Sequence, residues 1–234
     1  MPNQARRQKH GGLLANLGFN IIIPTLILTK FSGDDALGPA WAIVVALSFP
    51  VGYGIRDYLH TREPNFFSLL GVFSVILTGS MSLLELPPRY IAIKEAAIPG
   101  IIGLATLVSV YTRYPLVRLF LLNDQILHVD KVYAALEQHG NQLQFQKQMK
   151  RATVMVAASF FLSSALNFIL AEAILVSEPG TPAFAAELGR MTALSFPVIA
   201  LPSMIVLMAA LWYLLKGIQQ LTHLKLEDLF IDHT

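Results

Sequence analysis

Two adjacent charged residues, Lys94 and Glu95, lie inside an apolar run of the sequence from Tyr90 to Tyr111. Pro99 follows Glu95 by four residues, and a proline in a helix cannot donate the hydrogen bond that the Glu95 carbonyl would accept. The segment therefore offers an ammonium, a carboxylate and a free carbonyl. A charge at membrane depth costs about 2.5–3.5 kcal/mol on insertion scales, so such residues usually face protein or water and have a function. Their types suit the binding of an ion or a small polar or anionic solute.

The composition places these charges in a membrane protein. The chain has 234 residues, of which 54% are hydrophobic and 14% charged, whereas a soluble domain is about one-quarter charged. Apolar runs of about 20 residues are typical of membrane-spanning helices. We therefore predict an all-α, polytopic membrane protein that forms a single integral membrane domain, residues 1–234. Its six transmembrane helices are expected at about 11–30, 39–59, 66–85, 90–111, 152–176 and 191–216.

The positive charges predict the orientation of these helices. Thirteen of the seventeen lysines and arginines fall on the side of the N-terminus, whereas Lys30, Arg89 and Arg190 fall on the other side. The positive-inside rule then places both termini in the cytoplasm. The basic N-terminus before an apolar run is also typical of a signal peptide. Asn16 and Asn20 interrupt that run, however, and we predict a retained first helix.

A short repeat connects the two ends of the chain. The six residues Ala46–Val51 recur letter for letter as Ala193–Val198, and Asn20 and Asn167 are separated by the same 147 residues. This pattern predicts a duplicated helical hairpin, with helices 1–2 and 5–6 as its copies. Internal repeats are frequent in transporters, whose sites lie near the midplane where the repeats meet. The alternative is a chance similarity between apolar segments.

The asparagines define a second group of candidate binding residues. Asn20 and Asn167 are both expected near mid-bilayer, and a further polar residue, Asn16 or Ser163, precedes each by four positions on the same helix face. Asn16, Asn20 and Asn167 are therefore candidates for a solute or ion site between the hairpins. The alternative is that they join helices through hydrogen bonds, as polar residues commonly do in membranes.

Four prolines are expected to kink the helices. Pro24, Pro50, Pro99 and Pro197 each lie inside an apolar run, where the missing N–H frees a backbone carbonyl.

Lys94 has a candidate partner on another helix. Glu172 is expected at about the same depth, close to the outer boundary of the fifth helix, so we predict an ion pair between Lys94 and Glu172, with Glu95 as the other possible partner. The alternative is that both side chains extend outward to the headgroups.

The residues between helices 4 and 5, 112–151, form the one long cytoplasmic connection. Apolar residues recur there at spacings of three and four, which predicts an amphipathic helix over 116–138. The apolar face of this helix is expected to pack under the bundle or against a protein partner. The C-terminal tail carries His223, Glu227, Asp228, Asp232 and His233, and we expect it to be solvated rather than to bind a metal.

Signatures of soluble enzymes are missing from the sequence. It contains no cysteine, no His-Glu-x-x-His, no Gly-x-Ser-x-Gly and no phosphate-binding glycine loop. We expect no catalytic residues, no metal, no cofactor and no nucleic-acid partner, and hence no enzyme.

Several short motifs carry a family resemblance. They are Asn20-Ile21-Ile22-Ile23-Pro24, Lys94-Glu95-Ala96, Ser109, Pro115-Leu116-Val117-Arg118, Phe160-Phe161 and Leu166-Asn167. With them the chain resembles the bacterial intracellular septation protein A family and its larger six-helix relatives. The resemblance implies a multi-pass protein of the bacterial inner membrane, connected with envelope upkeep and division and without a settled activity. Two functions are compatible with this sequence: a small-solute or ion transporter, and a non-transporting envelope scaffold.

Overall fold

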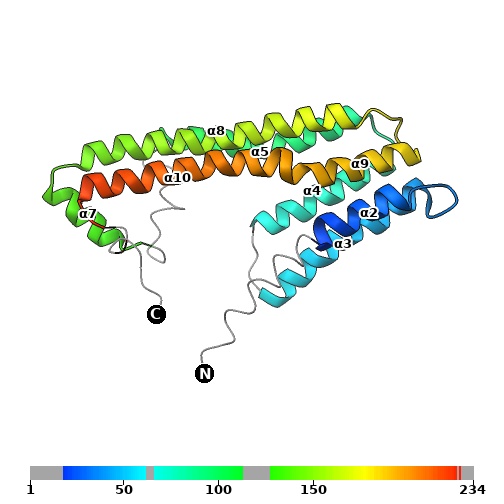
Figure 1. Ribbon diagram of the computed structural model, residues 1–234, viewed down its shortest axis with the longest axis horizontal. Coiled ribbons are helices and arrows are strands. Elements are labelled where there is room, and N and C mark those ends of the chain that lie inside the picture. The colour runs from blue at the N-terminus through cyan, green and yellow to red at the C-terminus, as the bar shows by residue number, and fades with distance from the viewer. Residues whose placement is uncertain (1–17, 62–65, 113–126, 226, 228–234) are drawn as a thin grey trace, which may run out of the picture. The chain divides into compact units, whose positions relative to one another are not determined.

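The computed structural model describes residues 18–61, 66–112, 127–225 and 227, and every regular element in this part of the chain is a helix (Figure 1). The all-α prediction is therefore confirmed. In chain order the elements are η1 (Gly18–Ile22), α2 (Ile23–Lys30), α3 (Gly38–Thr61), α4 (Phe66–Leu83), α5 (Pro88–Ser109), α7 (Val129–Gln138), α8 (Gln142–Ile174), α9 (Pro182–Ser195), η2 (Phe196–Ala200) and α10 (Leu201–Thr222).

Four helical segments are long and apolar enough to cross a membrane, and two apolar helices are shorter. Large apolar side chains such as Trp41, Leu69 and Ile205 remain more than 60% exposed on these helices. Water-soluble proteins rarely expose extensive apolar patches, whereas lipid covers such surfaces. The protein is thus a multi-pass membrane protein. The long segments are Gly38–Arg56, Pro88–Ser109, Gln142–Ile174 and Pro182–Thr222, and the shorter ones are Gly18–Lys30 and Leu69–Leu83.

Two helices begin earlier than the apolar runs indicate. α8 begins at Gln142 rather than near 152, and α9 at Pro182 rather than near 191. The first turns of α8 are polar, so hydropathy does not detect them. α9 has a local start signal, since the Thr181 hydroxyl accepts a hydrogen bond from the Phe184 N–H (3.2 Å) and Pro182 follows the cap.

Proline explains the two wide helical turns, η1 and η2. Both are π-helical, and both have prolines nearby. Pro24 follows η1, whereas η2 contains Pro197 and is followed by Pro202. A proline lacks the N–H of the i→i−4 bond and its ring crowds the preceding turn, and π turns inside helices relieve such conflicts.

The predicted duplication is not evident in the local backbone. Asn20 lies in the π turn η1 whereas Asn167 lies within α8, and Pro50 lies within α3 whereas Pro197 lies in the π turn η2. The duplicated hairpin therefore stays a prediction.

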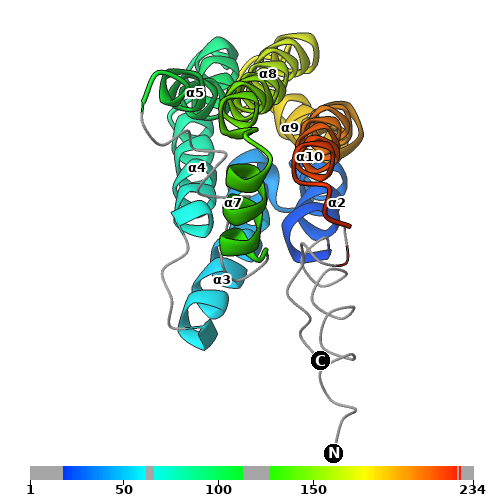
Figure 2. The same ribbon diagram turned by 90° about the vertical axis from the view of Figure 1, so that its left-hand side faces the viewer.

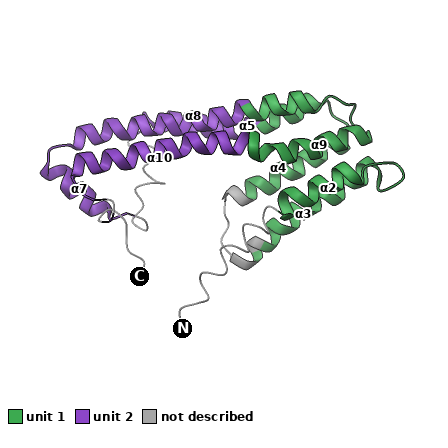
Figure 3. Cartoon of the chain, in the orientation of Figure 1, with its two compact units in different colours: residues 1–95, 166–198 green, residues 96–165, 199–234 purple. Residues whose placement is uncertain are grey.

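The chain divides into two compact units (Figure 3). Unit 1 comprises residues 1–95 and 166–198. Within it, α2 packs against α9 and α3, and α3 packs against α4. The contact between α2 and α9 is close because Gly189 has no side chain: a Cβ there would lie 2.9 Å from the Leu28 Cβ. Leu28 of α2 and Phe184 of α9 are both fully buried.

A carboxylate holds the connection between α8 and α9 in unit 1. Glu187 accepts hydrogen bonds from the N–H groups of Val176 (3.0 Å) and Ser177 (2.9 Å) and from the Ser177 hydroxyl (2.6 Å). These bonds satisfy backbone donors beyond the end of α8, so the connection to α9 is structurally defined.

Unit 2 comprises residues 96–165 and 199–234, and its core lies where α7 meets α8 and α10 (Figure 2). Val132 and Leu136 of α7 contribute to this core and are fully buried, which confirms that the apolar face of this helix docks within the protein. The core cluster consists of Leu127, Val132, Leu136, Phe145, Met149, Ala152, Leu214 and Ile218.

The prediction of one continuous helix over 116–138 is wrong. α7 begins at Val129, whose N–H bonds to the Leu127 carbonyl (2.9 Å). His128 between them has φ −72° and ψ 74°, the geometry of an inverse γ-turn, which a helix cannot continue through. Residues 116–126 lie outside the described part of the chain.

Candidate functional site

The charged residues singled out in the sequence form one polar centre between α4 and α5 in unit 1. The Lys94 ammonium lies 2.6 Å from Oε1 of Glu95 and 2.6 Å from the Thr78 hydroxyl. It also donates to the hydroxyl of Ser74 (2.9 Å) and to the Ser74 carbonyl (3.2 Å). The three N–H groups of Lys94 therefore share four acceptors.

The two partners of the ion pair differ in access. The Lys94 side chain is 6% exposed and the Glu95 side chain 24%. The ammonium is thus enclosed by protein, whereas the carboxylate retains an open side. An ion pair of this kind is stable only where the remaining protons are hydrogen-bonded, because burying a charge without partners is costly.

Helix α4 provides the acceptors through the spacing of its polar residues. Ser74 and Thr78 are four residues apart and so lie on one face of α4, toward Lys94. Neighbouring residues on a helix do not face one another, so Lys94 and Glu95 meet only because both side chains bend toward this face. The Thr78 hydroxyl is also within reach of Glu95 (3.4 Å) and of the Ser74 carbonyl (3.0 Å).

The predicted Lys94–Glu172 ion pair is wrong. Lys94 is paired with Glu95, and Glu172 is exposed on α8. The alternative of a lysine extended to the headgroups also fails for Lys94, since its ammonium is buried. The pair that forms is the alternative one with Glu95, and the sequence did not indicate that the Ser74 and Thr78 hydroxyl groups of α4 complete it.

The asparagines lie on other elements of the fold than Lys94 and Glu95, which are on α5. Asn20 on η1 and Asn167 on α8 are each half-buried, and both have interaction partners. Asn16 lies outside the described residues. The solute site that we predicted at the asparagines therefore stays a prediction.

The prolines lie in helical segments, as expected, and one has a polar neighbour. Pro50 and Pro99 are inside α3 and α5, whereas Pro24 is the second residue of α2. In unit 2 the Ser164 hydroxyl of α8 donates to the Ala96 carbonyl (2.7 Å), three residues before Pro99. The hydroxyl therefore bonds to the carbonyl one residue beyond that of Glu95, which is the carbonyl that Pro99 leaves without a helical N–H.

Neither Ser74 nor Thr78 is identified as a functional residue by the sequence analysis. A signal was present: hydroxyl residues at i and i+4 on an apolar helix, followed by a short connection to a helix that carries a lysine. Only the packing of α4 on α5 shows that the two elements share one polar centre.

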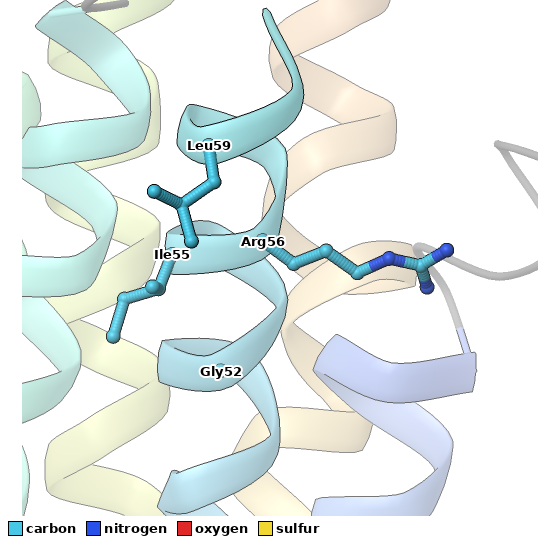
Figure 4. A pocket seen from close by; sticks show the side chains of 4 residues that line it. All are labelled: Gly52, Ile55, Arg56 and Leu59. Atoms are coloured by element: carbon cyan, nitrogen blue, oxygen red, sulfur yellow. The ribbon is translucent and has the colours of Figure 1, made fainter. Parts of the chain in front are cut away.

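Two grooves lie on α3 in unit 1. One, of about 350 Å³, is lined by Gly52, Ile55, Arg56 and Leu59, and Figure 4 shows Arg56 extending away from Ile55 and Leu59. The other, of about 240 Å³, runs between α3 and α4 and is mainly apolar. Neither groove is lined by the charged pair or by the asparagines.

In the described part of the chain, no three or more histidine or carboxylate residues are grouped in an arrangement that could hold a metal ion. Comparison with family models, curated proteins and solved structures gave no match. The Lys94–Glu95 centre is therefore the structural feature from which a function can be inferred.

Proposed function

We propose that the protein is an ion transporter of the bacterial inner membrane in which Glu95 exchanges its Lys94 partner for a proton or a monovalent cation. The observation that carries this proposal is the unequal access of the pair, with Lys94 enclosed and Glu95 partly open. Intramembrane ionisable residues generally mark ion pathways. Because the accessible member is a carboxylate, the site suits a cation better than the small polar or anionic solute that the sequence favoured.

The hydroxyl groups of α4 make such an exchange chemically reasonable. When a cation or proton neutralises Glu95, the Lys94 ammonium keeps three acceptors, from Ser74 and Thr78. The lysine therefore need not be left without partners at any stage. The six-helix arrangement with both termini in the cytoplasm belongs to this proposal, since the lysine and arginine distribution supports it.

Ion flux in reconstituted vesicles tests the proposal. Purified protein would be incorporated into liposomes that contain a pH-sensitive dye, and a Na⁺ or K⁺ gradient would be imposed. We expect wild-type vesicles to change their internal pH faster than protein-free vesicles, and Glu95→Gln to abolish the difference. Glu172→Gln, which alters an exposed carboxylate on α8, is the matched control and should retain the flux. Wild-type vesicles that behave like empty ones would refute ion exchange.

A non-transporting envelope scaffold is the second candidate. It is favoured by the complete hydrogen bonding of Lys94, which requires no ligand. Any protein partner of this scaffold would meet the polar side of α7, because its apolar face is covered by α8 and α10. The scaffold is supported if Lys94 variants lose the folded protein while the wild type carries no flux.

A further inference from the structure

Two histidines that are far apart in the sequence lie in contact in unit 2. The imidazole rings of His139 and His223 have centroids 4.8 Å apart, with an angle of 74° between the ring planes. His139 is the C-cap of α7 and His223 is the C-cap of α10. Both side chains are exposed, so the pair is accessible from water.

The backbone around His139 is well defined. The N–H groups of Gly140 and Asn141 bond to the carbonyls of Glu137 (3.1 Å) and Leu136 (2.9 Å), which is the Schellman arrangement of a helix end. Gly140 has φ +68°, a conformation that glycine adopts without strain. The Asn141 side chain then donates to the Leu221 carbonyl (2.8 Å), which fixes the end of α7 to α10.

His223 has an uncommon backbone conformation. Its φ is 58°, in the left-handed region, and such a conformation costs a non-glycine residue about 1–2 kcal/mol. This conformation ends α10 and is the one in which its ring meets that of His139. Strained residues of this kind often occur at binding sites.

We propose that His139 and His223 bind one divalent transition-metal ion such as Zn²⁺ or Ni²⁺, with water as the remaining ligands. Imidazole suits these ions. With metal–nitrogen bonds of about 2.0–2.1 Å and an angle near that of a tetrahedron, two imidazoles on one ion have ring centroids about 5 Å apart. The observed separation meets this requirement. Rotation of the exposed rings brings one nitrogen of each to the ion.

The helix ends add to the attraction for a cation. Both histidines lie at helix C-termini, where the macrodipole places partial negative charge. Two such ends converge here, because α7 packs against α10. A bound ion would connect the two helices, and unit 2 would then be more stable in its presence.

Calorimetric titration of ZnCl₂ into the detergent-purified protein, without a polyhistidine tag, tests the site. We expect a single Zn²⁺ per chain, and a loss of affinity of about tenfold or more in both His139→Gln and His223→Asn, since one imidazole alone lacks the chelate effect. Asparagine tolerates the left-handed conformation, so His223→Asn preserves the backbone. His128→Gln, at the start of α7, is the control and should bind like the wild type. Wild-type affinity in either of the first two variants would overturn the proposal.

A second measurement needs no substitution. Diethyl pyrocarbonate modifies accessible imidazoles, and mass spectrometry gives the rate at each histidine. Zn²⁺ should slow the modification of His139 and His223 together and leave His128 unaffected. Protection of one ring without the other would show that the two do not share an ion.

Discussion

The Nζ atom of Lys94 lies 2.6 Å from Oε1 of Glu95, so two residues that are neighbours in the chain form an ion pair inside an apolar helix. The pair is completed by Ser74 and Thr78 of α4 rather than by a carboxylate from a distant helix. Its stability therefore depends on one helix–helix contact.

Removing the lysine alone should be strongly destabilising. Lys94→Met leaves the Glu95 carboxylate without its counter-charge, and breaking a buried pair costs about 3–5 kcal/mol. Lys94→Met combined with Glu95→Leu should regain most of this loss, because an apolar replacement of a buried pair is often neutral. Unfolding by SDS in mixed micelles, followed by circular dichroism, measures the free energy of unfolding of the single and the double variant. A stable single variant would show that Glu95 finds another partner.

The Thr78 hydroxyl should contribute measurably. Thr78→Val keeps the shape but removes an acceptor of Lys94, and hydrogen bonds to charged groups contribute about 1.5–3 kcal/mol. Thr78→Ser should be close to wild type. Thr106→Val is a matched control, because the buried Thr106 hydroxyl bonds to the Ile102 carbonyl of its own helix. Equal losses at positions 78 and 106 in the same unfolding assay would contradict a special role for Thr78.

Gly189 should not accept a side chain. In Gly189→Ala the new Cβ would lie 2.9 Å from the Leu28 Cβ and 3.0 Å from the Thr29 methyl, so α2 must move away from α9. We expect a loss of about 1–3 kcal/mol, as for other overpacked sites. Gly71→Ala on α4 meets no atom within 4 Å and should be neutral or stabilising. Thermal unfolding gives the midpoint temperature of each alanine variant, and the difference between these two temperatures tests the prediction.

At Gly217, in contrast to Gly189, the atoms that an added Cβ would meet belong to a flexible side chain. A Cβ at Gly217 would collide with the Gln148 side chain, whose Nε2 donates to the Tyr213 carbonyl (2.9 Å). Gly217→Ala should therefore cost about 1 kcal/mol by displacing that hydrogen bond. Adding Gln148→Ala should restore stability, since alanine also favours the helix by about 1 kcal/mol over glycine. A double variant that is less stable than Gly217→Ala would exclude this explanation.

The buried face of α7 should not accept a charge. Val132→Asp places a carboxylate in the core cluster of unit 2, whereas Ala134→Asp on the same helix places it in an exposed position. We expect the first variant to lose monodisperse protein in size-exclusion chromatography and the second to behave like the wild type, because an unpaired buried charge is costly. Similar profiles would mean that α7 is not docked through Val132.

The sequence predicts the positions of the helices well, but it predicts the contacts between them poorly. Apolar runs located α3, α4 and α5 to within a few residues, since hydropathy reports lipid exposure directly. The polar start of α8 at Gln142 carries no such signal, and the turn at His128 depends on a single backbone geometry. The sequence marks Lys94 as unusual. Whether its ammonium binds Ser74 or Glu172, however, depends on how α4 packs, which periodicity does not encode.

The adjacency of Lys94 and Glu95 also bears on how α5 enters the membrane. A helix that relied on Glu172 would carry an isolated ammonium into the bilayer until α8 had been synthesised and inserted. With Glu95 beside it, the segment is net neutral at this point as soon as it leaves the ribosome, and the two insertion penalties of about 2.5–3.5 kcal/mol can offset one another locally. The nascent α5 thus brings its own counter-ion, and α4, synthesised just before it, is already present to provide the hydroxyl groups.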